Sequence, residues 1–154
     1  MSKKTDSLEA LRDAINIRKR VMNALKFLIL QAQKRAENLA PNSEELRIER
    51  FNMWLIKEEC NTIASTSADI SRNLRTANTI FPTYMSEYEE RRNFMNRALA
   101  ACNVLQDELQ YVADAVYADK NKFTALVLDI ETLFRKIKSI RQADNRFLRQ
   151  LKER

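Results

Sequence analysis

Eight lysines and arginines lie in the last twenty residues of the chain, RKIKSIRQADNRFLRQLKER, at positions 135 to 154. Only Asp144 and Glu153 oppose them, so this segment carries a formal charge of +6. The whole chain of 154 residues also has a formal charge of +6, so the rest of it sums to zero. Clustered lysine and arginine bind phosphates and release the counterions condensed on nucleic acid. The segment therefore predicts a surface that binds a polyanion, RNA or DNA.

We expect the phosphate contacts to come from the outward side chains of this segment. They are Lys136, Lys138, Arg141, Arg146, Arg149 and Lys152. Two other interpretations stay open, a solvated helix face without a partner and a docking surface for an acidic protein. Binding to anionic lipid is disfavoured because the apolar face of the segment is needed for a core. We expect no membrane partner.

The composition excludes several kinds of catalytic and metal site. The chain contains no histidine and no glycine. Without histidine there is no Ser-His-Asp triad, no Cys-His pair and no Glu-x-x-His motif of the di-iron bundles. Without glycine there is no Gly-rich phosphate loop and no dinucleotide fingerprint. We therefore expect no catalytic residue, no metal and no cofactor, and a protein that is not an enzyme.

The absence of glycine also indicates the fold class, because glycine is the default residue of tight turns. Apolar residues recur at helical 3-4 spacing in four segments. The predicted helices span residues 6–39, 43–79, 86–117 and 120–152. Short connections make neighbouring helices antiparallel. We predict an all-α, up-down-up-down four-helix bundle that forms one domain over residues 1–154. A long coiled-coil hairpin, or a bundle completed by a second chain, is the alternative.

The breaks between the segments carry helix start signals. The proline of IFPTY, Pro82, ends one helix before the next begins. Asp119 is a candidate cap for the last helix. Three pairs have capping-box spacing: Asp6 with Glu9, Asn42 with Glu45, and Ser86 with Glu89.

Away from the helix starts, charged residues interrupt the predicted core stripes at three places, Arg18, Arg91 and Asp144. The first stripe is expected to run through Leu8, Leu11, Ile15, Arg18, Met22, Leu25, Ile29, Ala32, Ala36 and Leu39. The second is expected to run through Leu46, Glu49, Met53, Ile56, Cys60, Ile63, Ser67, Ile70, Leu74 and Ala77. The third is expected to run through Arg91, Met95, Ala98, Cys102, Leu105, Leu109, Val112 and Val116, and the fourth through Phe123, Leu126, Ile130, Leu133, Ile137, Ile140, Asp144, Phe147 and Leu151. Reflecting the chain about each turn places both arginines within about one helical turn of Asp144. A buried carboxylate without a partner costs several kcal/mol. We predict that Asp144 accepts hydrogen bonds from Arg18, Arg91 or both; a polar site for a ligand or RNA is the alternative.

A second set of apolar residues lies outside the predicted core stripes of the first two helices. A contiguous apolar patch on a protein surface marks an interface, and aromatic residues are favoured anchors there. We therefore predict a homo-oligomer; a wider core that absorbs these side chains is the alternative. The residues are Phe27, Leu30, Phe51, Trp54 and Leu55.

Cys60 and Cys102 fall at nearly the same level of the predicted bundle. We expect two reduced core residues, since free cysteine behaves as a small hydrophobe. A disulfide requires Cα atoms within about 7 Å. The start, MSKKTDS, lacks the apolar region of a signal peptide. We therefore expect a cytoplasmic protein.

Two stretches resemble the accessory variability determinant proteins of diversity-generating retroelements. They are IFPTYMSEYEERRNFMNRALAACNVLQDELQYV, residues 80 to 112, and IKSIRQADNRFL, residues 137 to 148. The shared features are an aromatic-proline turn, a charged helix start and a basic last helix. This family belongs to a four-helix-bundle group that includes proteins encoded in ribosomal RNA intervening sequences. In the family the Phe-Pro turn follows the first helix, whereas Phe81-Pro82 follows the second predicted helix here.

The resemblance implies a non-enzymatic, basic accessory protein that forms a ring, with a pentamer as the candidate assembly. It implies a reverse transcriptase and structured RNA or DNA as partners, and a role in mutagenic cDNA synthesis. Only the general trait of basic helix surfaces carries over to this chain, and no individual contact residue does.

Overall fold

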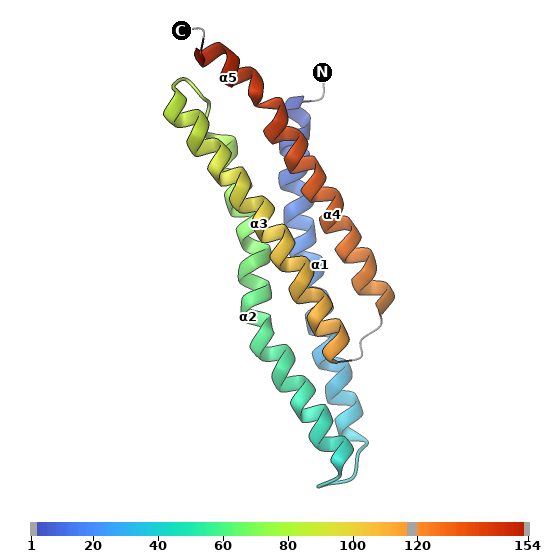
Figure 1. Cartoon of the computed structure of the whole chain (residues 1–154). Coiled ribbons are helices and arrows are strands. Elements are labelled where there is room, and N and C mark those ends of the chain that lie inside the picture. Colours follow the sequence, from blue (N-terminus) through green and yellow to red (C-terminus); the bar gives the residue numbers. More distant parts are fainter. Residues whose placement is uncertain (1–2, 117–119, 153–154) are drawn as a thin grey trace.

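The computed structural model describes residues 3–116 and 120–152 of the chain. The helices are α1 (Lys3–Glu37), α2 (Glu44–Thr79), α3 (Met85–Ala115), α4 (Lys120–Ala143) and α5 (Asn145–Lys152). Figure 1 shows them side by side as long rods, with α5 continuing α4 past the single residue Asp144. The described residues contain no β-strand. The predicted all-α four-helix bundle is confirmed.

Each long helix packs against two neighbours in the order α1, α2, α3, α4 and back to α1. Contacts between side chains establish that α1 and α2 run antiparallel. Ser7 near the start of α1 hydrogen-bonds Asn78 near the end of α2, while Arg35 pairs with Glu49 at 2.8 Å. In the same way α4 runs antiparallel to α1, since Asp129 pairs with Arg20 and the later Lys136 pairs with the earlier Glu9. Helix α3 runs antiparallel to α4, since Asn96 bonds Arg141 and the later Gln106 bonds the earlier Val127. Together these contacts give the up-down-up-down order.

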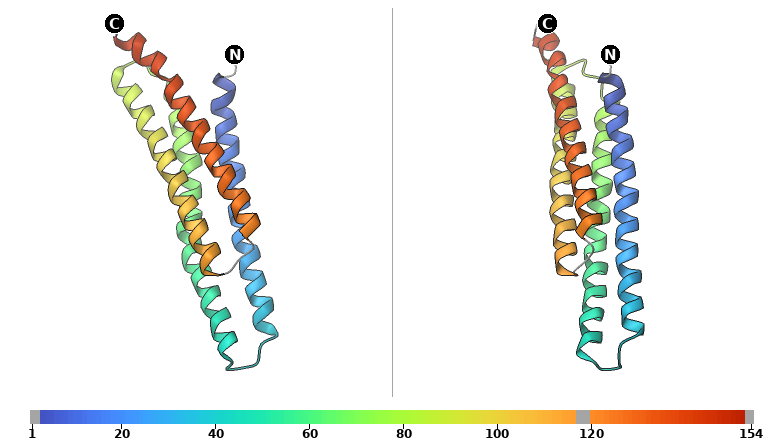
Figure 2. Two further views of the ribbon diagram at one scale, coloured as in Figure 1. Left: turned by 45° about the vertical axis from the view of Figure 1, so that its right-hand side comes forward. Right: turned by 90° about the vertical axis from the view of Figure 1, so that its right-hand side faces the viewer.

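The helices differ in length, and this difference shapes the molecule. The α1–α2 hairpin projects beyond the end of α3 and the start of α4 in all three views (Figures 1 and 2). Asn42 in the hairpin loop has a φ of 64°, a left-handed conformation that asparagine tolerates better than most residues. The bundle therefore has four helices at one end and only two at the other.

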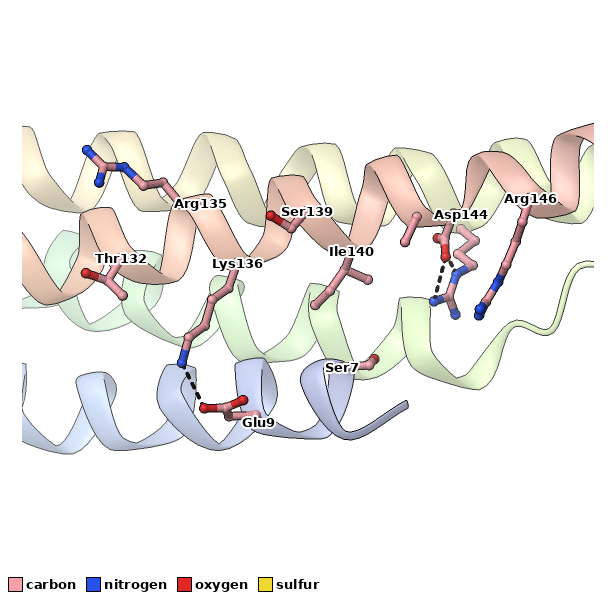
Figure 3. Close-up of a pocket in the computed structure, with 11 residues that line it drawn as sticks. Ser7, Glu9, Thr132, Arg135, Lys136, Ser139, Ile140, Asp144 and Arg146 are labelled. Atoms are coloured by element: carbon pink, nitrogen blue, oxygen red, sulfur yellow. Dashed lines mark hydrogen bonds and ion pairs between the residues drawn. The ribbon is translucent and has the colours of Figure 1, made fainter. Parts of the chain in front are cut away.

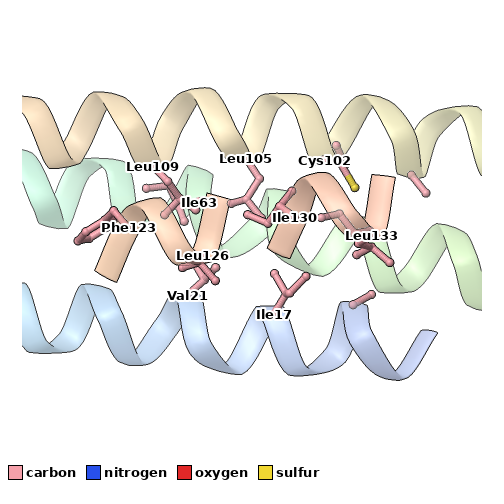
Figure 4. Packing of buried hydrophobic residues seen from close by; sticks show 14 of the residues in the cluster. Ile17, Val21, Ile63, Cys102, Leu105, Leu109, Phe123, Leu126, Ile130 and Leu133 are labelled. Atoms are coloured by element: carbon pink, nitrogen blue, oxygen red, sulfur yellow. The ribbon is translucent and has the colours of Figure 1, made fainter. Parts of the chain in front are cut away.

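The core is a continuous set of Leu, Ile, Val and Ala side chains from α1 to α4 (Figure 4). The stripes predicted for the second, third and fourth helices are largely buried, for example at Ile63, Leu105 and Ile130. The stripe predicted for the first helix is correct at Leu25 and Ala32, which are buried, and wrong at most other positions. Leu8 is 56% exposed, and the other buried residues of α1 are Ala10, Ala14, Ile17, Val21 and Leu28.

The error on α1 has a physical cause. Adjacent apolar residues such as Ala10–Leu11 and Ala14–Ile15 make an apolar face wider than one stripe. Two stripes with the same 3-4 spacing are then possible. Packing against both α2 and α4 buries the alanine stripe fully, whereas Leu11 and Ile15 become half-buried.

The helix ends differ from the predicted capping boxes. Ser43, not Asn42, caps α2, because its Oγ accepts the Leu46 N–H at 3.2 Å. At the start of α3 the carboxylate of Glu87, not Glu89, accepts from the N–H groups of Thr83 and Tyr84. Helix α1 begins at Lys3, ahead of Asp6, so Asp6 does not start it. Asp119 lies outside the described residues.

Both cysteines are free thiols, with Cys102 buried and Cys60 half-buried. Burial raises the pKa of the Cys102 thiol to about 12, with a smaller contribution from the Glu131 charge. Cys102 therefore behaves as a core side chain at neutral pH. Among the described residues, no helix combines the length and the apolar character needed to cross a membrane.

Candidate nucleic-acid interface

A buried ion pair fixes α4 against α3 at the four-helix end of the molecule. The Arg91 Nε donates to Asp144 Oδ2 at 2.7 Å, and its Nη2 donates to Oδ1 at 3.4 Å. The Arg91 Nη1 also donates to the carbonyls of Ala77 and Ile80, at 2.8 and 3.3 Å. One guanidinium thus joins the end of α2, the start of α3 and the end of α4. The predicted Arg91–Asp144 contact is confirmed.

The predicted contact of Arg18 with Asp144 is wrong. Arg18 is exposed, and both Asp144 oxygens accept from Arg91. The pairs between α1 and α4 place Asp129 opposite Arg20 and Lys136 opposite Asp13. Continuing along the antiparallel helices places Asp144 beside the first turns of α1, well before Arg18. The prediction assumed that all four helices have the same length. The α1–α2 hairpin in fact extends past the end of α3 and the start of α4, so the levels of the residues shift.

The single residue between α4 and α5 holds the two helices almost in line. Asp144 N donates to the Ile140 carbonyl at 3.0 Å, and Phe147 N donates to the Asp144 carbonyl at 2.9 Å. The Phe147 ring meets the Phe81 ring edge-on, with centroids 5.6 Å apart. Helix α5 packs against α3 and α4, and its backbone makes no close contact with α1. The basic C-terminal segment therefore leans toward the start of α3.

This arrangement forms a hollow of about 400 Å³ between α3 and α4, which we call the basic groove. Its four cationic side chains come from both helices, and no acidic side chain lines it. Glu89 and Glu90 are exposed on the first turns of α3 but do not line the groove. The lining residues are Arg92, Arg135, Lys138, Ser139, Arg141, Gln142 and Asn145.

Neutral groups orient two of the cations in the basic groove. Arg141 Nη1 donates to Asn96 Oδ1 at 2.7 Å, and Arg92 Nη1 donates to the Tyr88 hydroxyl at 3.4 Å. The Tyr88 hydroxyl in turn donates to Asn145 Oδ1 at 3.2 Å. Hydrogen bonds to neutral partners hold the guanidinium groups without cancelling their charge. Arg135 pairs with Glu131 of its own helix at 3.5 Å. Within the described residues, Arg92, Lys138 and Arg141 make no ion pair, so the groove offers these three cations to an anion.

Lys136 lies on the other side of α4. Its Nζ donates to Asp13 Oδ2 at 2.6 Å and to Glu9 Oε1 at 3.1 Å on α1. The hydrogen bonds that Lys136 donates to Asp13 and then to Glu9 raise its pKa. Two carboxylates thus compensate this charge, and Lys136 does not line the basic groove. We remove it from the set of proposed phosphate contacts.

The other predicted contacts divide between the basic groove and α5. Lys138 and Arg141 line the groove, with the Lys138 Nζ 5.7 Å from the centre of the Phe134 ring. Arg146, Arg149 and Lys152 are exposed on α5 and lie outside the groove. Arg92 and Arg135 were missing from the predicted set. Arg135 belongs to the basic segment of residues 135 to 154, whereas only the packing of α3 on α4 identifies Arg92.

The predicted apolar surface is split by the structure. Leu55 is only 8% exposed, so the prediction that it lies outside the core is wrong. It lies on the buried face of α2 beside Ile56. Phe27, Leu30, Phe51 and Trp54 are exposed, by 41 to 58%. Phe51 and Trp54 lie 5.6 Å apart on α2, whereas Phe27 lies under the Lys122 amine of α4 at 4.0 Å. Ile48, 53% exposed on α2, was missed.

No group of three or more metal-ligating side chains occurs in the part of the chain that the structure describes. Comparisons with models of protein families, with curated proteins and with solved structures give no match for this chain. The resemblance to retroelement accessory proteins therefore stays a prediction, and the basic groove is characterised by its own geometry.

Proposed function

We propose that this chain is a non-enzymatic nucleic-acid-binding protein whose basic groove binds the phosphates of RNA or DNA. The observation that supports this most directly is the lining of the groove. It contains four cations from two helices and no carboxylate. Phosphate contacts of this kind supply most of the affinity of non-specific nucleic-acid binding. The proposed contacts are Arg92, Arg135, Lys138 and Arg141, with Arg146, Arg149 and Lys152 extending them along α5.

The lining of the groove favours a nucleic acid over an acidic protein. Protein interfaces depend on a few buried apolar or aromatic anchors. Every residue that lines the basic groove is polar or charged. A nucleic-acid backbone needs no apolar anchor, because cations and hydrogen-bond donors bind its phosphates and sugars. An acidic protein partner remains the competing outcome of the binding experiment.

The proposal extends to a partner and an assembly. From the resemblance of residues 80 to 112 and 137 to 148, the protein assists a retroelement reverse transcriptase in cDNA synthesis in the cytoplasm. The exposed Leu30, Phe51 and Trp54 on the α1–α2 hairpin support self-association, because large apolar side chains gathered on a surface mark interfaces.

Light scattering tests the proposed self-association. Phe51→Ala with Trp54→Ala is expected to reduce the particle mass, whereas the exposed Tyr111→Ala is not; a monomeric wild type contradicts it.

The groove is tested by reversing two charges in it. We expect Lys138→Glu with Arg141→Glu to weaken binding to single-stranded RNA by at least about tenfold at low salt. The slope of log affinity against log salt should also fall by about 2, because two phosphate contacts are lost. Fluorescence anisotropy over a salt series measures both quantities.

A matched control reverses the same number of charges elsewhere. Arg47 and Arg50 are exposed at the start of α2, at the opposite end of the molecule. Arg47→Glu with Arg50→Glu gives the same net charge and should leave the affinity near that of wild type. Equal losses in both variants would show that net charge alone matters. Absence of binding to RNA and DNA by the wild type would overturn the proposal in favour of a protein partner.

A further inference from the structure

A second hollow lies on the opposite side of α4 from the basic groove, between α4 and the first turns of α1. Its volume is about 450 Å³, within the roughly 300–1,000 Å³ of small-molecule sites. Helix α5 leans toward α3 and makes no close backbone contact with α1, which leaves this space between α1 and α4 open. Figure 3 shows the lining residues, six of which support the binding of a ligand. They are Ser7, Glu9, Ser139, Ile140, Asp144 and Arg146.

Two satisfied ion pairs form walls of this pocket. Lys136 is held by Glu9 at 3.1 Å on the α1 side, and Arg91 is held by Asp144 at 2.7 Å at the far end. Both pairs join different helices, so they limit the movement of the walls. Preorganised walls reduce the cost of binding a ligand. The pocket is thus a built feature of the four-helix end.

One cation at the pocket is left for an anion. Arg146 makes no ion pair with an acidic side chain within residues 3–116 and 120–152. Its guanidinium lies 4.8 Å from the centre of the Phe147 ring. In Figure 3 the side chain extends along the end of the pocket that Asp144 occupies. A phosphate at this end would receive the bidentate hydrogen bonds that arginine provides.

The rest of the lining suits a flat ring with polar edges. Ile140 and Ala143 provide an apolar floor, and Ile140 is only 8% exposed. Hydroxyl groups of Ser7 and Ser139 and the Glu9 carboxylate stand around this floor. Nucleobases combine an apolar face with donors and acceptors on their edges. Apolar floor, polar rim and free guanidinium together match a nucleotide.

The pocket and the basic groove are connected through α4. Arg135 and Ser139 line both hollows, so the two lie on either side of the same turns of this helix. Figure 3 shows Arg135 directed toward α3, the side of the basic groove. A strand that lies in the groove needs to cross only one turn of α4 to reach the pocket.

We propose that the pocket between α1 and α4 holds one unpaired nucleotide. This nucleotide belongs to the strand whose phosphates lie in the basic groove, so the inference rests on the proposed function. A paired base cannot leave its duplex without the loss of stacking and pairing. The protein therefore prefers single-stranded or looped nucleic acid to a continuous duplex.

The experiment separates the base from the phosphates. Two single-stranded RNAs of equal length are compared, one intact and one abasic at its central positions, so that both carry the same charge. We expect wild type to bind the intact RNA about tenfold more tightly, the size of one stacking contact. Ala143→Phe, which fills the pocket without changing charge, should remove this preference and leave the affinity for the abasic RNA unchanged.

Two further variants make the result decisive. Ala100→Phe, on an exposed position of α3, is the matched control and should keep the preference. Arg146→Gln should weaken the binding of both RNAs and keep the preference, because Arg146 contacts a phosphate that both RNAs carry; Arg146 is exposed, so the fold should not be disturbed. Circular dichroism checks that each variant is folded. Equal affinity of wild type for intact and abasic RNA overturns the pocket proposal while the groove proposal stands.

Free nucleotides separate failure of the pocket from failure of the groove. If neither RNA binds, the proposed function is overturned, and nucleoside monophosphates are titrated into wild type while amide NMR signals are followed. Shifts confined to the turns around Ser7, Ile140 and Arg146 then support a site for a free nucleotide. Absence of shifts overturns the pocket as well.

Discussion

The two sides of α4 carry similar basic residues but compensate them differently. Toward α1, Asp129 pairs with Arg20 at 2.6 Å and Lys136 pairs with Asp13 at 2.6 Å. Toward α3, Arg141 bonds the neutral Asn96, and no carboxylate lines the basic groove. Among the groove cations, Arg135 pairs with Glu131 of its own helix at 3.5 Å. Helix α4 thus presents compensated charges to α1 and mostly uncompensated cations to α3.

This difference shows that the partners of a basic residue decide its role more than its own helix does. Lys136 and Lys138 are two positions apart, and the sequence treats them alike. Because the helix rotates by about 100° per residue, they point to different neighbours. The acidic residues of α1 lie within reach of Lys136. The uncompensated cations of residues 136 to 152 therefore lie on the α3 side of α4 and on α5.

The largest expected effect comes from breaking the ion pair that holds α4 in place. Asp144→Ala leaves the Arg91 guanidinium buried without its carboxylate, and we expect a loss of about 3–5 kcal/mol in the free energy of unfolding. Chemical denaturation followed by circular dichroism measures it. Arg91→Leu with Asp144→Leu should recover part of the loss, since no unpaired charge remains. A loss below about 1 kcal/mol for Asp144→Ala would contradict a buried, essential pair.

The second effect tests the two sides of α4 directly through RNA affinity. Lys138→Glu should weaken RNA binding severalfold, because it reverses a cation of the basic groove. Lys136→Gln should change the affinity by less than about twofold, because that charge is already compensated by Glu9 and Asp13. Anisotropy titrations at one low salt concentration compare the two variants. A larger loss from Lys136→Gln than from Lys138→Glu would reverse the assignment of the two sides.

The smallest effect concerns stability at high pH. The pKa of Lys136 is raised above its usual 10.5 by the hydrogen bonds that it donates to Asp13 and Glu9. A raised pKa means that the stabilisation is complete below pH 10.5 and is lost as the pH rises through the folded-state pKa. Lys136→Met should remove less than about 1 kcal/mol at neutral pH, because the pair is partly exposed. Melting temperatures should differ between wild type and variant at pH 9 and converge as the pH rises from 10.5 through the raised folded-state pKa; a constant difference would argue against the linkage.

Much of the fold was predictable because helical periodicity is a local property. The core positions of α3, such as Met95, Cys102 and Leu109, are the predicted ones. The Arg91–Asp144 pair was also predictable, since a charge in an apolar stripe needs a nearby partner. The stripe of α1 was not, because two adjacent apolar stripes satisfy the same local pattern. The ends of the helices shifted as well, from Asn42 to Ser43 and from Glu89 to Glu87.

The candidate site was predictable only in part. Lys138 and Arg141 were among the predicted contacts, while Arg92 comes from a helix far away in the sequence. Lys136 could not be separated from Lys138 without the position of α1. Leu55 could not be separated from Trp54 without knowing which face of α2 is buried.

The sequence by itself determined the helical class, the segregation of the whole net charge into residues 135 to 154, and the absence of histidine- and glycine-dependent sites. These depend on composition and on contacts within one helix. The tertiary structure alone decided which cations are compensated, which apolar residues stay exposed, and that hollows lie on both sides of α4. The physical reason is that these properties depend on the lengths, register and tilt of neighbouring helices. The sequence of one helix does not determine its position along the bundle relative to another helix.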